Sequence, residues 1–274
     1  MHIDCHQHFW RLDRGDYDWL TPDLAAIHRD FLPADLAPIL ARHGIAGTVL
    51  VQAAATIAET EFMLEIAAKT GFVRGVIGWV DFDARRVRDD IDRLAQNPLI
   101  KSFRPMIQDI ADPTWMLRPH LAPIIECLQA GDIAFDALLK PLHLKPFQEF
   151  LHRYPYLRIV IDHGAKPNIA AGAFDVWADE MRLIARDQRV HCKVSGLITE
   201  AKSDWTAAQI RPYIDFLLEA FGPRRLMWGS DWPVVNLAGG YDRWRQASHE
   251  VIAGLSQAEQ DAILGGTATA FYRL

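Results

Sequence analysis

Two histidines separated by a single residue stand close to the start of the chain. Residues 1–8 read MHIDCHQH, so His6 and His8 share one side of an extended segment, because side chains alternate along a strand. Two imidazoles on one side are natural ligands for a borderline metal ion such as zinc. The same spacing also fits two hydrogen-bonded histidines at a strand end that bind no metal. The motif alone leaves both interpretations open.

Other polar side chains follow later apolar segments and could join the two histidines. Asp162 and His163 come after one such segment, Asp231 comes after another, and Arg104 and Asp136 end two more. A carboxylate beside imidazoles can bind a metal ion or take a proton from water. Taken singly, Asp231 also fits a helix N-cap and Arg104 a solvated surface cation. Their shared position, each at the end of an apolar segment, predicts one common site.

The segments that carry these residues are short, apolar and rich in β-branched side chains, which is typical of buried strands. We expect strands at residues 2–5, 47–52, 73–80, 100–104, 133–136, 158–162, 191–195 and 225–229. Between them, apolar residues recur at helical spacing, as at Val87, Ile91 and Leu94. Glycines stand where several of these helices should end, at Gly44, Gly71, Gly131 and Gly222.

A strand followed by a helix, repeated about eight times, is the pattern of an α/β fold of the (β/α)8 TIM-type barrel class. Such a barrel places its active site at the carboxyl ends of the strands, where the polar residues above are found. The alternative is an open, doubly wound sheet, but no glycine-rich phosphate loop follows the first strand. No low-complexity linker divides the chain, so we expect one domain over residues 1–274. Cys5, which alternates with inward-facing residues, is expected to face the helices.

Composition narrows the class of protein. The chain has 274 residues, which suits one barrel, and its formal net charge of -6 argues against nucleic acid or an anionic membrane as a partner. No apolar run approaches the ~18 residues of a membrane span, and residues 1–8 lack the features of a secretion signal. The three cysteines show no CxxC spacing and fit a reducing compartment. We therefore expect a soluble, cytoplasmic protein.

Taken together, the motifs resemble the amidohydrolase superfamily and, within it, the sugar-lactonase branch of fuconolactonases and rhamnonolactonases. The resemblance rests on HQH at residues 6–8, DHGAKP at residues 162–167 and GSDWP at residues 229–233. Trp10, the segment YDWL at residues 17–20 and the tail at residues 255–272 also suit that branch. The similarity extends over essentially the whole chain.

The resemblance implies an amidohydrolase-like barrel that hydrolyses small cyclic esters. It assigns His6, His8, His163 and Asp231 to the catalytic centre, and the same four residues are the candidate metal ligands. Asp231 would be the general base that activates water. The histidines would polarise the carbonyl, with or without one divalent ion.

This chain departs at two positions from the metal-dependent members of that superfamily. Many of them carry a bridging lysine or glutamate on the fourth strand and a histidine on the fifth, where this chain has Arg104 and Asp136. A binuclear centre is therefore not expected. The resemblance is compatible with one divalent metal ion, zinc before others. It is also compatible with a metal-independent site, as is thought for the related pyrone-dicarboxylate lactonases.

Five further residues are candidates for substrate binding. Trp10 and Trp232 could stack on the apolar face of a sugar ring. Arg104 and Lys166 could hydrogen-bond hydroxyl groups or a carboxylate, and His28 lies in a first loop that could form a lid. Rim packing, loop capping and a plain surface position are their structural alternatives. Because Arg104 is the only strand-end arginine placed at the mouth, a neutral lactone fits better than a dicarboxylate.

We therefore expect hydrolysis of a sugar lactone, an aldonolactone such as L-fuconolactone, to its aldonic acid. One alternative is a metal-dependent non-oxidative decarboxylase of an aromatic or muconate-type acid, which would share the barrel. Another is a catalytically inactive sugar-binding barrel, although a pure binder has no need of a positioned base. The expected partner is a small-molecule lactone, and a homo-oligomer is compatible with the sequence. The sequence does not determine which lactone is preferred.

Overall fold

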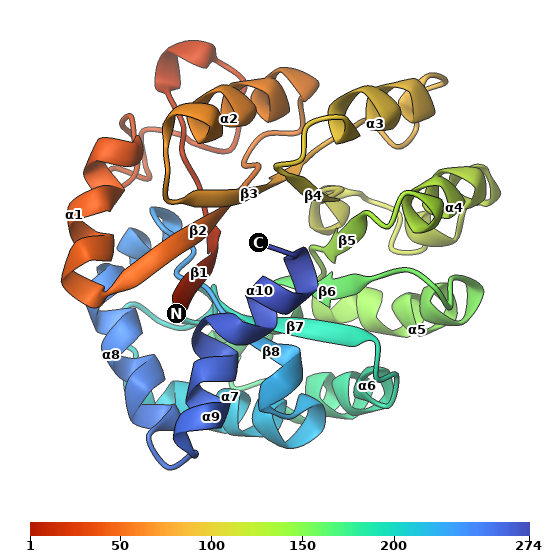
Figure 1. Ribbon diagram of the computed structural model, residues 1–274. Helices are drawn as coiled ribbons and strands as arrows, with labels where there is room; N and C mark the ends of the chain where they lie inside the picture. The colour runs from red at the N-terminus through yellow and green to blue at the C-terminus, as the bar shows by residue number, and fades with distance from the viewer.

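Eight parallel strands form one nearly closed barrel in the computed structural model, which describes residues 1–274 (Figure 1). Each strand pairs with the next one along the chain, and a parallel bridge between Gln7 and Trp232 joins the first strand to the segment after the last. The barrel prediction is confirmed, and the open doubly wound sheet is wrong. The strands are β1 His2–Gln7, β2 Ile45–Val51, β3 Val73–Gly78, β4 Ile100–Phe103, β5 Ala134–Ala137, β6 Ile159–Ile161, β7 Val190–Val194 and β8 Leu226–Trp228.

Helices surround the barrel (Figure 1). All eight strands lie within two residues of the positions expected from the sequence, and seven of the outer helices match the helical patterns found there. Gly44 follows the first helix with a φ of 63°, a left-handed conformation that glycine adopts without steric penalty. The helices are α1 Pro33–His43, α2 Ile57–Lys69, α3 Val87–Ala95, α4 Ala122–Ala130, α5 Leu144–Arg153, α6 Asp175–Ala185, α7 Ala207–Phe221, α8 Gly240–Ile252, α9 Gln257–Asp261 and α10 Thr267–Tyr272.

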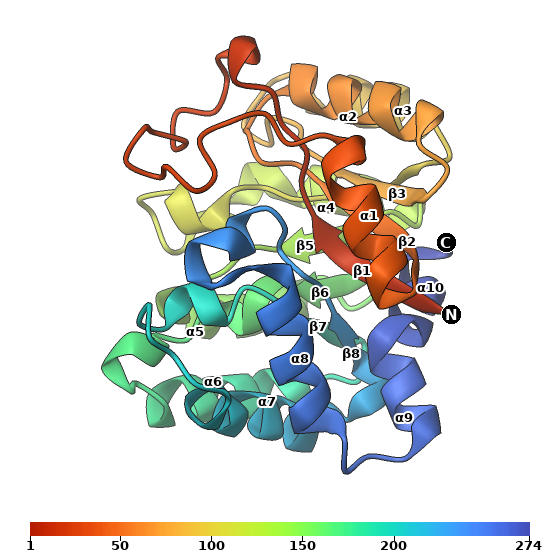
Figure 2. The same ribbon diagram turned by 90° about the vertical axis from the view of Figure 1, so that its left-hand side faces the viewer.

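The last helix closes the end of the barrel at which both termini lie (Figure 1). Phe271 and Tyr272 of α10 belong to one apolar cluster with side chains of the barrel interior, among them Val49 and Ile77. The carboxyl ends of the strands lie at the opposite end, where the long loop of residues 8–32 projects (Figure 2). No helix of the structure is long and apolar enough to cross a membrane.

A bulge in β1 changes the direction of its side chains. β1 advances from Asp4 to Gln7 while its partner β2 advances only from Thr48 to Leu50, so β1 contains one extra residue there. Cys5 consequently packs in the apolar cluster of the barrel interior. The prediction that Cys5 faces the helices is wrong, because the bulge breaks the simple alternation on which it was based.

Candidate active site

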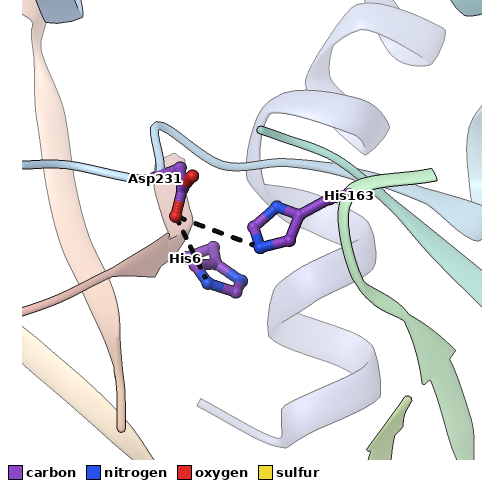
Figure 3. A group of neighbouring side chains, drawn as sticks. All are labelled: His6, His163 and Asp231. Atoms are coloured by element: carbon purple, nitrogen blue, oxygen red, sulfur yellow. Dashed lines mark ion pairs between the residues drawn. The ribbon is translucent and has the colours of Figure 1, made fainter. Parts of the chain in front are cut away.

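Three of the predicted residues converge from separate strands at the carboxyl end of the barrel (Figure 3). His6 lies on β1, His163 in the turn after β6, and Asp231 three residues after the end of β8. Oδ1 of Asp231 is 3.7 Å from Nε2 of His6 and 4.0 Å from Nε2 of His163. The two imidazole rings have their centroids 4.4 Å apart. All three side chains are buried.

His8 contacts the same carboxylate oxygen. Its Nε2 is 3.2 Å from Oδ1 of Asp231, and its Nδ1 is 2.8 Å from the backbone carbonyl of Val51 on β2. The structure therefore brings together all four residues that the sequence proposed for the catalytic centre. Asp231 is the residue that they share.

The backbone is strained at two residues of the site, His163 and Asp231, which both come after strands. His163 and Asp231 have φ values of 54° and 59°, and the three residues after His163 are also left-handed. Such conformations are uncommon outside glycine and cluster at functional sites. Asp231 is fixed in this geometry by its own N–H, which donates to the carbonyl of His6 at 2.8 Å.

Burial and the neighbouring groups together determine which residues of the site are charged. Burial alone would raise the pKa of Asp231, but His163, the hydrogen bond with His8 and the nearby His6 hold it below its ordinary value. Burial lowers the pKa of His163 to about 4, against the opposing effect of Asp231. At neutral pH Asp231 is thus a carboxylate and His163 a neutral ring.

A fully buried layer of charged side chains lies next to His6. Nζ of Lys193 on β7 is 2.5 Å from Oδ2 of Asp136 and 2.9 Å from Oδ1 of Asp162. Arg104 donates to Oδ2 of Asp162 at 3.1 Å, and Oη of Tyr272 donates to Asp136 at 2.7 Å. The sequence placed Asp136 and Asp162 among the strand-end residues of one common site but gave neither them nor Lys193 a specific role. A lysine within an apolar strand was the signal that could have indicated this layer.

A cleft of about 360 Å³ opens beside the catalytic group. This volume lies within the range of small-molecule sites. A more open hollow of about 920 Å³ adjoins it but contains none of the histidines, so we place the chemistry in the smaller cleft. His6 is fully buried and does not line it. The polar side chains that do line it include His8, Arg104, His163, Lys166, Glu200 and Asp231.

The five residues proposed for substrate binding divide into two groups. Arg104 and Lys166 line the cleft. Trp10 and Trp232 are buried, with 0% and 2% of their surface exposed, and His28 is half-buried. None of these last three lines the cleft. Both tryptophans pack edge-on against Phe31, so their rings support the loop of residues 8–32.

Trp19 and Glu200 are among the lining residues that were not predicted as binding residues. Trp19, which the sequence gave only as part of the segment at residues 17–20, donates through Nε1 to the carbonyl of Ala53 at 2.7 Å and meets Trp10 edge-on. Glu200 follows β7 and lies 3.8 Å from Nζ of Lys166. The position of Glu200 in a loop after a strand was the available signal, the same one that marked Asp231.

The residues at the centre fit one divalent cation. Ligand atoms of His6, His163 and Asp231 lie within 4.8 Å of one another, and two imidazoles with a carboxylate are a donor set that suits zinc. Nε2 of His6 is buried and has no hydrogen-bond partner. Asp136, where metal-dependent amidohydrolases often have a histidine, is held by Lys193 instead.

Comparison with known proteins gives a family and two relatives that share one name. The family model described as amidohydrolase matches residues 3–274. A protein of Burkholderia ambifaria named L-fucono-1,5-lactonase is 44% identical over 279 residues, which cover 99% of this chain and 95% of that one. A Burkholderia multivorans protein of the same name is 35% identical and covers 100% and 96%.

A solved structure resembles the whole chain closely. It is an amidohydrolase from Burkholderia multivorans with bound zinc, 36% identical to this chain. The TM-score is 0.94, and the match covers 100% of this chain and 99% of that one.

Proposed function

The chain belongs to the amidohydrolase family, and we propose that it hydrolyses a sugar lactone to the aldonic acid with Asp231 as the general base. One observation carries the proposal. Oδ1 of Asp231 lies at the wall of the cleft with imidazole nitrogens of three histidines 3.2, 3.7 and 4.0 Å away. We take residues 1–274 as one catalytic domain, because the first strand and the last helix both complete the barrel.

Opening a lactone requires a nucleophilic water, a stabilised oxyanion and a proton for the leaving alkoxide. Asp231 would take a proton from water as the water oxygen bonds to the carbonyl carbon. The bond from that carbon to the ring oxygen then breaks, and Asp231 returns the proton to the ring oxygen. His163, which lines the cleft beside Asp231, would hydrogen-bond the former carbonyl oxygen, while His8 stays in contact with Asp231.

A neutral substrate fits the charges of the cleft. Arg104 is already paired with Asp162 at 3.1 Å, and Lys166 lies 3.8 Å from Glu200. Each positive charge therefore already faces a carboxylate of the protein, which favours a neutral substrate. Among neutral lactones, L-fucono-1,5-lactone is the first candidate, because two whole-chain relatives are named for it.

A divalent metal ion is compatible with the same residues. His6, His163 and Asp231 would hold it, and zinc is the first candidate because the similar Burkholderia multivorans amidohydrolase was crystallised with zinc. Such an ion, when bound, polarises a carbonyl and lowers the pKa of a coordinated water.

A pH-indicator assay of aldonolactones tests the proposed function. Purified protein should release acid from L-fucono-1,5-lactone much faster than the spontaneous rate, and parallel assays with a chelator, together with elemental analysis, measure the need for a metal. No acceleration with any aldonolactone would contradict the proposal. So would release of carbon dioxide from an aromatic acid as the main activity, which would favour the decarboxylase alternative.

A further inference from the structure

Lys193 is a lysine without exposed surface inside the barrel, and the reaction above gives it no task. Its Nζ has three neighbours. Oδ2 of Asp136 is 2.5 Å away, Oδ1 of Asp162 is 2.9 Å away, and Nδ1 of His6 is 3.3 Å away. Lys193 thus connects the buried charged layer to one residue of the catalytic group.

Two carboxylates keep Lys193 in its ammonium form. Burial alone would lower the pKa of this lysine, but Asp136 and Asp162 raise it above its ordinary value. Both carboxylates are themselves fixed, Asp136 by the hydroxyl of Tyr272 and Asp162 by Arg104. The ammonium group therefore has a defined position as well as a defined charge.

The chemistry of an ammonium group decides where the ring of His6 carries its hydrogen. An ammonium has three N–H donors and no lone pair, so Nδ1 of His6, which is hydrogen-bonded to it, has to accept. Nδ1 of His6 consequently bears no hydrogen, and a neutral ring then bears it on Nε2. A doubly protonated ring does not fit the same contact, because its Nδ1–H would point at the ammonium.

We propose that Lys193 is a positioning residue that fixes the hydrogen of His6 on Nε2, so that His6 faces Asp231 as a hydrogen-bond donor. Nε2 lies 3.7 Å from Oδ1 of Asp231 and has no partner within the protein. The N–H of His6 then points toward the carboxylate of Asp231, so Lys193 orients the candidate base through His6. The inference deepens the proposed lactone hydrolysis, on which its kinetic part rests.

The hydrogen on Nε2 of His6 also hinders the binding of a metal ion to that nitrogen. A nitrogen that ligates a metal ion has to be free of hydrogen. A cation can bind to Nε2 of His6 only after that hydrogen has left, so Lys193 weakens the cation site formed by His6, His163 and Asp231. Removal of the ammonium should therefore weaken catalysis and strengthen zinc binding.

The hydrogen of His6 can be located directly in the unaltered protein. Long-range 1H–15N correlation spectra of metal-stripped, histidine-labelled protein distinguish the two neutral forms of each ring, and the His6→Asn variant identifies the His6 signals by their absence. We expect the hydrogen on Nε2. A hydrogen on Nδ1, or a doubly protonated ring, would overturn the role of Lys193 whatever the activity on lactones. Failure of the lactone assay alone would instead overturn the proposed function.

A charge-balanced pair of variants tests the consequence. Lys193→Met combined with Asp136→Asn removes one charge of each sign, and Asp136→Asn alone is the matched control because it keeps the contact of Lys193 with His6. Relative to the control, the double variant should lose about 10- to 100-fold in kcat at similar KM, as outer residues that orient a catalytic group typically do. It should also bind zinc more tightly in competition with a chromophoric chelator. Equal kcat and equal zinc affinity in the two folded variants would contradict the proposal.

Discussion

Nε2 of His8 lies 3.2 Å from Oδ1 of Asp231, while Nδ1 of the same ring lies 2.8 Å from the carbonyl of Val51. A carbonyl oxygen can only accept, so Nδ1 carries a hydrogen. The contact of Nε2 with the carboxylate is then favourable when a proton or a cation lies between the two atoms. His8 therefore connects the candidate base to β2.

Replacement of His8 by asparagine should reduce kcat/KM by about 10- to 100-fold, because a hydrogen bond to a charged group contributes about 1.5–3 kcal/mol. Steady-state rates of lactone hydrolysis measure this change. The control is His152→Asn on the exposed side of α5, which should leave the rates unaltered. A His8→Asn variant with the wild-type kcat/KM would show that the contact has no part in turnover.

Gly196 should be essential for the position of His163. A Cβ at Gly196 would lie 2.5 Å from Nδ1 of His163, which now lies 2.9 Å from the hydroxyl of Ser195. Gly196→Ala should therefore displace the ring and reduce kcat by about 100-fold, the effect of a displacement of about 1 Å in a catalytic group.

The Gly172→Ala variant is the control that distinguishes displacement of the His163 ring from the effect of backbone strain alone. Gly172 has nearly the same left-handed φ as Gly196, 65° against 61°, but no atom lies within 4 Å of the added Cβ. Both variants should lose about 1–2 kcal/mol of stability in urea unfolding, since both place alanine in the left-handed region. Only Gly196→Ala should lose activity, and equal losses of kcat in both would refute the steric explanation.

Glu59 should make the stability of the protein depend on pH. Burial raises its pKa to about 7 from 4.5, although the N–H groups of Ala53 and Ala54 donate to its carboxylate. Between these two values the folded state holds a proton that the unfolded chain has lost, so the free energy of unfolding falls as pH rises through this window. The expected loss is about 3 kcal/mol.

The Glu59→Gln variant provides the comparison for this pH effect. It lacks the titrating group, so its free energy of unfolding should fall less than that of the wild type between about pH 4.5 and about pH 8. Urea unfolding at the two pH values measures the difference. Parallel pH dependence of the two proteins would show that Glu59 titrates as it does in water.

The fold was predictable because eight strand and helix patterns repeat along the chain, and because a barrel then brings the ends of all strands to one mouth. That rule placed His6, His163 and Asp231 together although up to 225 positions separate them in the sequence. The direction of Cys5 was not predictable, because a bulge in β1 depends on its pairing with β2.

The contacts around the site could be predicted less well from the sequence. Trp10 and Trp232 carry the right chemistry for sugar stacking, but tertiary packing buries both rings against Phe31. The ion pairs of Lys193 on β7 join it to Asp136 on β5 and to Asp162 just after β6, and only the inward direction of each side chain creates them. Such directions depend on barrel register, which residue types alone do not specify.

The rate of lactone hydrolysis by the Asp231→Asn variant tests the central claim most directly. The substitution keeps the shape of the side chain and removes the base, so kcat should fall by about 10²- to 10⁴-fold. Circular dichroism should show that the barrel is retained. A folded Asp231→Asn protein that opens the lactone at close to the wild-type rate would contradict the account.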